Sequence, residues 1–126
     1  MSNARPRQRV LVVDDDADTR DLYRWVFESR GYGVDEAENG AVGIARARML
    51  HPDLIVVDND MPVMSGVDAA RVLRADIACA AIPIIMLSAG RPPTRDGALW
   101  SYVQKPVTVE ALIAHARAAL GTAVTS

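Results

Sequence analysis

Short apolar runs alternate with longer amphipathic stretches along the chain. Three of the runs are hydrophobic at consecutive positions and rich in β-branched residues, and two others are weaker. A run that is apolar on both faces is typical of an interior strand of a parallel sheet, because an exposed antiparallel strand alternates polar and apolar positions. The pattern therefore predicts five strands, at residues 10–13, 33–37, 54–57, 82–87 and 99–103.

The stretches between these runs have helical periodicity. Apolar residues recur at helical spacing over residues 17–30, 40–50 and 65–78, and again after Thr108, which can cap the start of a helix. Within the third stretch, the residues predicted to face the sheet are Val67, Ala70, Val72, Leu73 and Ile77. The chain therefore alternates strands and helices with no repeat and no linker.

This alternation predicts the fold and the place of a site. Strands that alternate with helices imply right-handed crossovers and helices on both faces of one sheet. We therefore expect an α/β fold, a doubly wound, five-stranded parallel sheet of the flavodoxin-like (βα)5 type. Such folds place their sites beyond the carboxyl ends of the strands. The polar residues that follow predicted strands are Asp14, Asp15, Asp16, Asp58, Ser88 and Lys105. Of these, Asp16 is expected to cap the first helix.

Length and composition fit one globular domain. The 126 residues are 50% hydrophobic and 24% charged, and the formal net charge of -2 argues against a broad basic surface for nucleic acid. The single cysteine, Cys79, excludes an internal disulfide, fits a reducing cytoplasmic compartment and is expected to be buried. No apolar run approaches the roughly 18 residues of a membrane span. We expect a disordered arm at 1–7, the domain at 8–122 and a tail at 123–126.

Three of the acids at strand ends are expected to converge at one edge of the sheet. Carboxylates brought together repel one another and raise at least one pKa, which a divalent cation relieves. An acidic site with only oxygen ligands suits Mg²⁺, whereas a zinc site is disfavoured because the chain has no Cys/His cluster. We therefore predict a Mg²⁺ site at Asp14, Asp15 and Asp58. The two histidines, His51 and His115, are predicted to lie away from it.

A carboxylate beside Mg²⁺ can act as a nucleophile toward phosphorus and form an aspartyl phosphate. Phosphoryl transfer needs positioned groups and charge neutralisation more than further covalent chemistry. A lysine and a hydroxyl next to the acceptor would complete such a site. Lys105 and Ser88 are the residues that the predicted topology offers.

Four short motifs, each at the end of a predicted strand, resemble the receiver domain of two-component response regulators. They are VVDDD at 12–16, DNDMP at 58–62, LSA at 87–89 and KP at 105–106, in the family's order across residues 8–121. The resemblance implies that a histidine kinase or histidine phosphotransfer protein transfers a phosphoryl group to Asp58. It also implies that the domain then changes conformation to control a protein partner, without acting as an enzyme on other substrates.

The resemblance assigns roles to the residues around Asp58. Ser88 would hydrogen-bond a phosphoryl oxygen, and Lys105 would pair with the phosphoryl group. The Mg²⁺ ligands would be Asp14, Asp15, Asp58 and the backbone carbonyl of Asp60.

The resemblance also implies a switch and a special peptide bond. Tyr102 matches an aromatic residue that rotates inward on activation, so Ser88 and Tyr102 are the candidate switch residues. The bond between Lys105 and Pro106 is expected to be cis. Gly66 is expected where the loop after the acceptor turns into a helix.

The segment between Ser88 and Lys105 departs from the family pattern. It is shorter than the family usually has, and Pro92, Pro93 and Gly97 disfavour a helix within it. We therefore expect the fourth helix of the (βα)5 fold to be shortened or replaced by a loop. Since the family commonly signals through a face that includes this helix, we expect a monomer or a weak dimer, with output through another surface.

Three other interpretations remain open from the sequence. A pseudo-receiver would keep the fold for binding but would not be phosphorylated. A haloacid-dehalogenase-type phosphatase also uses an Asp-x-Asp nucleophile after a strand, but here Pro62 stands where Thr or Val is usual and there is no cap insertion. A nucleotide-binding flavodoxin-like role lacks a Gly-rich phosphate loop.

Overall fold

Five parallel strands form the centre of the structure, a computed structural model that describes residues 7–90 and 100–121. The strands are β1 (Arg9–Val13), β2 (Gly33–Ala37), β3 (Leu54–Asp58), β4 (Ile84–Ser88) and β5 (Ser101–Gln104), in the order β2-β1-β3-β4-β5. Val13, near the end of β1, pairs with Ala37 on one side and with Val57 on the other. The carboxyl ends of the central strands are therefore level, and the predicted doubly wound parallel sheet is confirmed.

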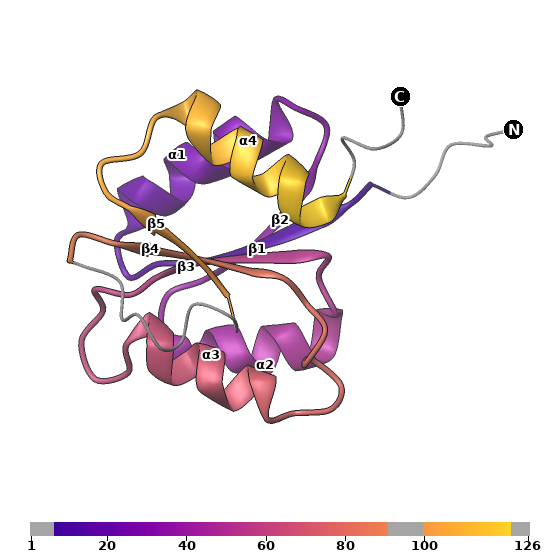
Figure 1. Cartoon of the computed structure of the whole chain (residues 1–126), viewed down its shortest axis with the longest axis vertical. Helices are drawn as coiled ribbons and strands as arrows, with labels where there is room; N and C mark the ends of the chain where they lie inside the picture. The colour runs from indigo at the N-terminus through magenta and orange to yellow at the C-terminus, as the bar shows by residue number, and fades with distance from the viewer. Residues whose placement is uncertain (1–6, 91–99, 122–126) are drawn as a thin grey trace, which may run out of the picture.

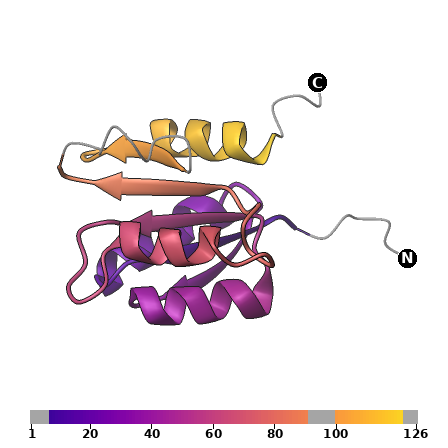
Figure 2. The ribbon, with the colours of Figure 1, turned by 60° about the horizontal axis from the view of Figure 1, so that its bottom comes forward.

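Helices cover both faces of this sheet (Figure 1). On one face lie α1 (Ala17–Glu28) and α4 (Val109–Leu120), and on the other α2 (Gly40–Leu50) and α3 (Gly66–Arg74), which pack side by side (Figure 2). The described residues contain these four helices, consistent with the expected loss or shortening of a fifth. The segment in which this fifth helix was expected to be shortened or absent falls mostly on residues 91–99, which lie outside the described residues. No helix in the described ranges is long and apolar enough to cross a membrane.

The apolar runs are hydrophobic at every position because both faces of the sheet are buried. Leu11 and Val13 belong to the core under α2 and α3, whereas Val10 and Val12 belong to the core under α1 and α4. Every residue of β3 and β4 is buried. Cys79 is fully buried as well, as the sequence predicted. Two hydrophobic cores therefore fix the sheet from both sides and hold its carboxyl edge in place.

Side chains cap each helix at its N-terminus. Asp16 accepts a hydrogen bond from the backbone N–H of Thr19 at 3.1 Å, and Thr108 caps α4 in the same way. Asn39 caps α2, and Ser65 forms a reciprocal capping box at the start of α3. These bonds satisfy backbone donors that the first turn of a helix leaves without partners. The predicted capping role of Asp16 is confirmed.

The predicted end of α3 was wrong. The helix ends at Arg74 and not at residue 78, and Ile77, predicted to face the sheet, is 97% exposed. Val72, also predicted to face the sheet, is 38% exposed. The carboxylate of Asp76 accepts a hydrogen bond from the backbone N–H of Ala78 at 3.0 Å, which gives the chain a local alternative to the helical bond. The chain therefore leaves the helix before Ile77.

Candidate functional site

The carboxyl ends of β1 and β3 bring three acids together. Asp14 follows β1, Asp58 is the last residue of β3, and each offers a ligand atom that lies within 4.8 Å of the others and of one from Asp15. Asp14 and Asp58 are 4% and 5% exposed, whereas Asp15 is exposed. The strand order reverses at β1, which has β2 on one side and β3 on the other. In a doubly wound sheet, a crevice forms at this point, at the carboxyl ends of the strands.

The electrostatics of this cluster suit a divalent cation. Burial raises the pKa of Asp14, and the charges of Asp58 and Asp15 raise it further. The backbone N–H of Asp16 donates to Asp14 Oδ1 at 2.9 Å and, with the charge of Lys105, opposes that rise. Two of the three carboxylates are buried and the third, that of Asp15, is exposed to solvent. Together they form a set of hard oxygen donors that fits Mg²⁺. The assignment of the Asp60 carbonyl as a further ligand stays a prediction.

Lys105 reaches the carboxylate of Asp58 from the end of β5. Its Nζ lies 2.6 Å from Asp58 Oδ1, and the same oxygen accepts the backbone N–H of Asp60 at 3.1 Å. Burial lowers the pKa of Lys105, but the hydrogen bond to Asp58 and the charges of Asp58, Asp60 and Asp14 outweigh it, so the pKa is raised overall. Lys105 is therefore a fixed cation beside a buried carboxylate.

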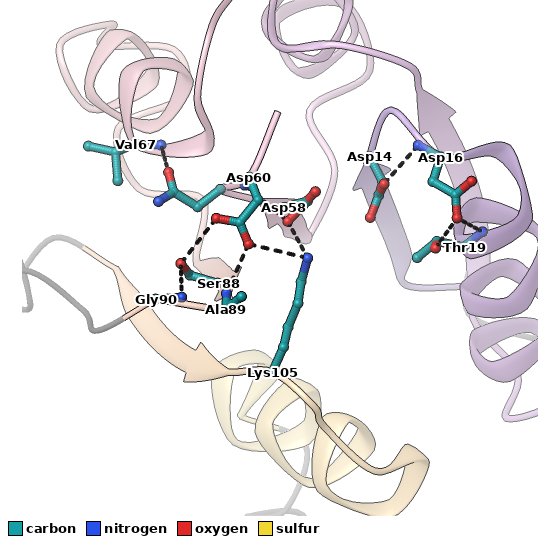
Figure 3. A network of polar contacts seen from close by, with 11 residues as sticks. Asp14, Asp16, Thr19, Asp58, Asp60, Val67, Ser88, Ala89, Gly90 and Lys105 are labelled. Carbon is teal, nitrogen blue, oxygen red and sulfur yellow. Dashed lines mark hydrogen bonds and ion pairs between the residues drawn. The ribbon is translucent and has the colours of Figure 1, made fainter. Parts of the chain in front are cut away.

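Ser88 meets this group from the end of β4, through the side chain of Asp60 (Figure 3). Ser88 Oγ lies 3.5 Å from Asp60 Oδ1 and accepts the backbone N–H of Gly90 at 3.2 Å. The backbone N–H of Ala89 donates to Asp60 Oδ2 at 2.9 Å, and Lys105 Nζ lies 3.5 Å from the same oxygen. From the sequence, only the backbone carbonyl of Asp60 was expected to take part in the site.

Asn59 and Gly66 hold the loop after Asp58, and sequence reasoning missed the role of Asn59. Asn59 Oδ1 accepts the backbone N–H of Val67, in the first turn of α3, at 2.9 Å. Gly66 begins α3, and a Cβ there would lie 2.7 Å from the carbonyl oxygen of Asp58 and 2.6 Å from Met86 Sδ. The loop therefore depends on the side-chain amide of Asn59, which binds α3, and on the absence of a side chain at Gly66.

Arg20 supports the loop after β1, which sequence reasoning also missed. Its Nη1 donates to the carbonyl of Asp14 at 2.7 Å, and its Nε pairs with Glu36 on β2 at 3.1 Å. Arg24, four residues later, pairs with Glu36 at 2.6 Å. The spacing of four places both arginines on one face of α1, and this is the signal that could have indicated them.

The remaining candidate residues lie around β5. Tyr102 is half-buried with a buried hydroxyl, and its ring meets that of the buried Trp100 edge to face at 6.2 Å. The peptide bond between Lys105 and Pro106 is cis. His51 follows the C-terminus of α2 and takes no part in the contacts described above.

Comparison with known proteins decides the family. Residues 10–117 match the sequence profile of the family described as the response regulator receiver domain. The chain belongs to this family. Residues 10–117 are thus a receiver domain, and the resemblance seen in the four motifs is confirmed.

Individual relatives agree with this membership. The receiver domain is 36% identical over 111 residues to the protein PilH of Pseudomonas aeruginosa, a match that covers 83% of this chain and 91% of that protein. It is 38% identical over 120 residues to the DNA-binding response regulator MtrA of Mycobacterium tuberculosis, covering 90% of this chain. That match covers 51% of MtrA, so the chain spans about half the length of this relative.

Solved structures show the same fold. The chemotaxis protein CheY4 of Vibrio cholerae superposes with a TM-score of 0.84 at 28% identity, over 91% of this chain and 100% of that one. A CheY-like receiver domain protein of Methanospirillum hungatei also gives a TM-score of 0.84, at 23% identity, over 93% of this chain and 96% of that one. The second likeness concerns the fold alone.

Proposed function

We propose that this receiver domain accepts a phosphoryl group on Asp58 from a histidine kinase or a histidine phosphotransfer protein. The observation that carries the proposal is the buried carboxylate of Asp58, which lies beside two further acids and 2.6 Å from the ammonium group of Lys105. Phosphoryl transfer to a carboxylate needs two groups that neutralise charge. One would be a cation bound by the three carboxylates, and the other is the fixed ammonium group of Lys105. The phosphorylated form then controls a protein partner.

The two oxygens of Asp58 have different surroundings. The donors from Lys105 and from the backbone of Asp60 both lie on Oδ1. Among residues 7–90 and 100–121, no hydrogen-bond donor lies on Oδ2, which makes Oδ2 the oxygen free to attack. Its lone pair forms the new O–P bond while the P–N bond of the phosphohistidine breaks, and the imidazole nitrogen leaves with the electron pair of that bond. The product is an acyl phosphate on Asp58 and an unmodified histidine.

The chain's own residues then stabilise the charge of the phosphoryl group. Lys105 would pair with one phosphoryl oxygen, and the hydroxyl of Ser88 would donate to another. Asp14, Asp15 and Asp58 would hold Mg²⁺, which when bound neutralises negative charge on the transferring group. Neutralisation by residues fixed before the reaction costs little reorganisation.

The wider assignments belong to the same proposal. The domain acts as a phosphoacceptor and not as an enzyme on other substrates, and its output is contact with a protein and not with nucleic acid. A cytoplasmic location and a monomeric or weakly dimeric state accompany it. The new charge at Asp58 supplies the switch, since a phosphoryl group adds about −1.5 to −2 charge and strong acceptors at one point.

Intact mass measurement after incubation with phosphoramidate and Mg²⁺ tests the proposal. We expect the wild-type mass to rise by one phosphoryl group and Asp58→Ala to remain unmodified. Asp21→Ala, which removes an exposed carboxylate from α1, is the control and should be modified like the wild type. Wild-type protein that stays unmodified with Mg²⁺ would instead support a pseudo-receiver.

A further inference from the structure

The side chain of Asp60 is the one acid of the site that no step above uses. It does not point away from the site, although it is 42% exposed. Its two oxygens face three donors at the ends of two other strands: Ala89 N–H at 2.9 Å, Lys105 Nζ at 3.5 Å and Ser88 Oγ at 3.5 Å. Figure 3 shows the carboxylate of Asp60 between Ser88 and Lys105, next to Asp58.

These donors are of the kind that a phosphoryl group needs. Carboxylate and phosphoryl oxygens are both anionic acceptors, and both are bound by ammonium groups, hydroxyls and backbone N–H groups. Two of the three, Lys105 and Ser88, are the residues proposed above to receive the phosphoryl oxygens. The third donor is the N–H of Ala89, the residue after Ser88, and it points toward the same carboxylate of Asp60.

We propose that the Asp60 carboxylate is an internal competitor, which occupies the phosphoryl-binding donors of the resting domain and must leave them when Asp58 is phosphorylated. The inference rests on the proposed function and deepens it, since it concerns the regulation of the same site. Asp60 lies two residues after the acceptor, and its backbone N–H is bound to Asp58 Oδ1 at 3.1 Å. The main chain is therefore anchored, and the carboxylate can exchange the donors for solvent by rotating its side chain.

Removal of the competitor should make phosphorylation faster. A hydrogen bond or exposed ion pair of this kind contributes about 0.5–1.5 kcal/mol, so we expect Asp60→Ala to be modified by phosphoramidate about twofold to twelvefold faster than the wild type. Asp60→Asn keeps an oxygen for Ala89 N–H but loses the charge, and its rate should lie between the two. Asp21→Asn removes an exposed carboxylate from α1 and should leave the rate unchanged.

The amide resonance of Ala89 distinguishes competition from a general change of charge. Without a phosphoryl analogue, this resonance should differ between the wild type and Asp60→Ala, because only the wild type has the 2.9 Å bond. At saturation with beryllium fluoride and Mg²⁺, the two resonances should converge, because the same analogue then occupies the donor in both proteins. A difference that persists undiminished at saturation overturns the inference.

The rates separate this inference from the proposed function. If the wild type is phosphorylated on Asp58 and Asp60→Ala is no faster, the inference fails and the proposed function stands. If only Asp60→Ala is phosphorylated, the inference is supported strongly. If neither protein is phosphorylated and Ala89 does not respond to beryllium fluoride, both proposals are wrong.

Discussion

Replacement of Asp14 by asparagine is expected to stabilise the domain in the absence of Mg²⁺. Asp14 and Asp58 are both buried, and their ligand atoms lie within 4.8 Å of each other. Two unit charges at that distance repel by about 3.5 kcal/mol at an effective dielectric constant of about 20. The ammonium group of Lys105, 2.6 Å from Asp58, offsets part of this repulsion. Asparagine retains an oxygen for the N–H of Asp16, so we expect a net gain of about 1–3 kcal/mol in the free energy of unfolding.

Urea denaturation at neutral pH with EDTA measures this gain as a higher midpoint with an unchanged slope. Asp21→Asn serves as the control and should stay within about 0.5 kcal/mol of the wild type, since it changes an exposed position. Mg²⁺ should then raise the stability of the wild type more than that of Asp14→Asn, because the variant has lost a ligand. An Asp14→Asn midpoint below that of the wild type in EDTA would refute the reasoning.

The same pair of proteins should respond differently to pH. Burial raises the pKa of Asp14 in the folded state, so the protonated form is favoured by folding. The stability contributed by Asp14 is therefore full below its unfolded-state pKa of about 3.9 and is lost as the pH rises through the folded-state pKa. The advantage of Asp14→Asn in EDTA should accordingly shrink as the pH falls from neutral toward 4. An advantage that grows on acidification would contradict this sign.

Three further predictions concern the supports of the site. Gly66→Ala should lower the free energy of unfolding by about 1–3 kcal/mol by urea denaturation, because its Cβ would overlap backbone and Met-sulfur atoms, whereas Gly90→Ala, whose Cβ meets nothing closer than 3.8 Å, should be nearly neutral. Asn59→Ala should cost about 0.5–2 kcal/mol and increase hydrogen exchange in the first turn of α3, and unchanged exchange there would argue against its anchoring role. Lys105→Met should cost about 1–2 kcal/mol in EDTA, after allowance for the partial exposure of the lysine, because Asp58 loses its cation; a variant as stable as the wild type would show that the pair contributes nothing.

The sequence predicts most of this fold because one physical signal repeats along the chain. A strand buried on both faces is expected to be apolar throughout, and Leu54–Asp58 and Ile84–Ser88 are apolar at every position except the last. The parallel order then brings the ends of these strands to one edge. This is why the sequence alone predicts that Asp58 and Ser88 lie at the same edge of the sheet.

Other features depend on contacts that no local pattern encodes. The end of α3 follows from a side-chain bond of Asp76 that competes with the helix, while the hydrophobic spacing continues through Ile77. The orientation of the Asp60 carboxylate depends on donors at residues 88, 89 and 105, which are distant in sequence. The role of Asn59 could not be predicted because its partner, Val67, is eight positions away in the helix that follows.

The measurement that tests the central claim most directly is chemical identification of the phosphorylated residue. Borohydride reduces an aspartyl phosphate to homoserine, so the domain can be treated with phosphoramidate and Mg²⁺, reduced, digested and sequenced by tandem mass spectrometry. The account predicts homoserine at position 58 and nowhere else. Homoserine at Asp14, Asp15 or Asp60 with Asp58 intact, or at no position, would contradict it.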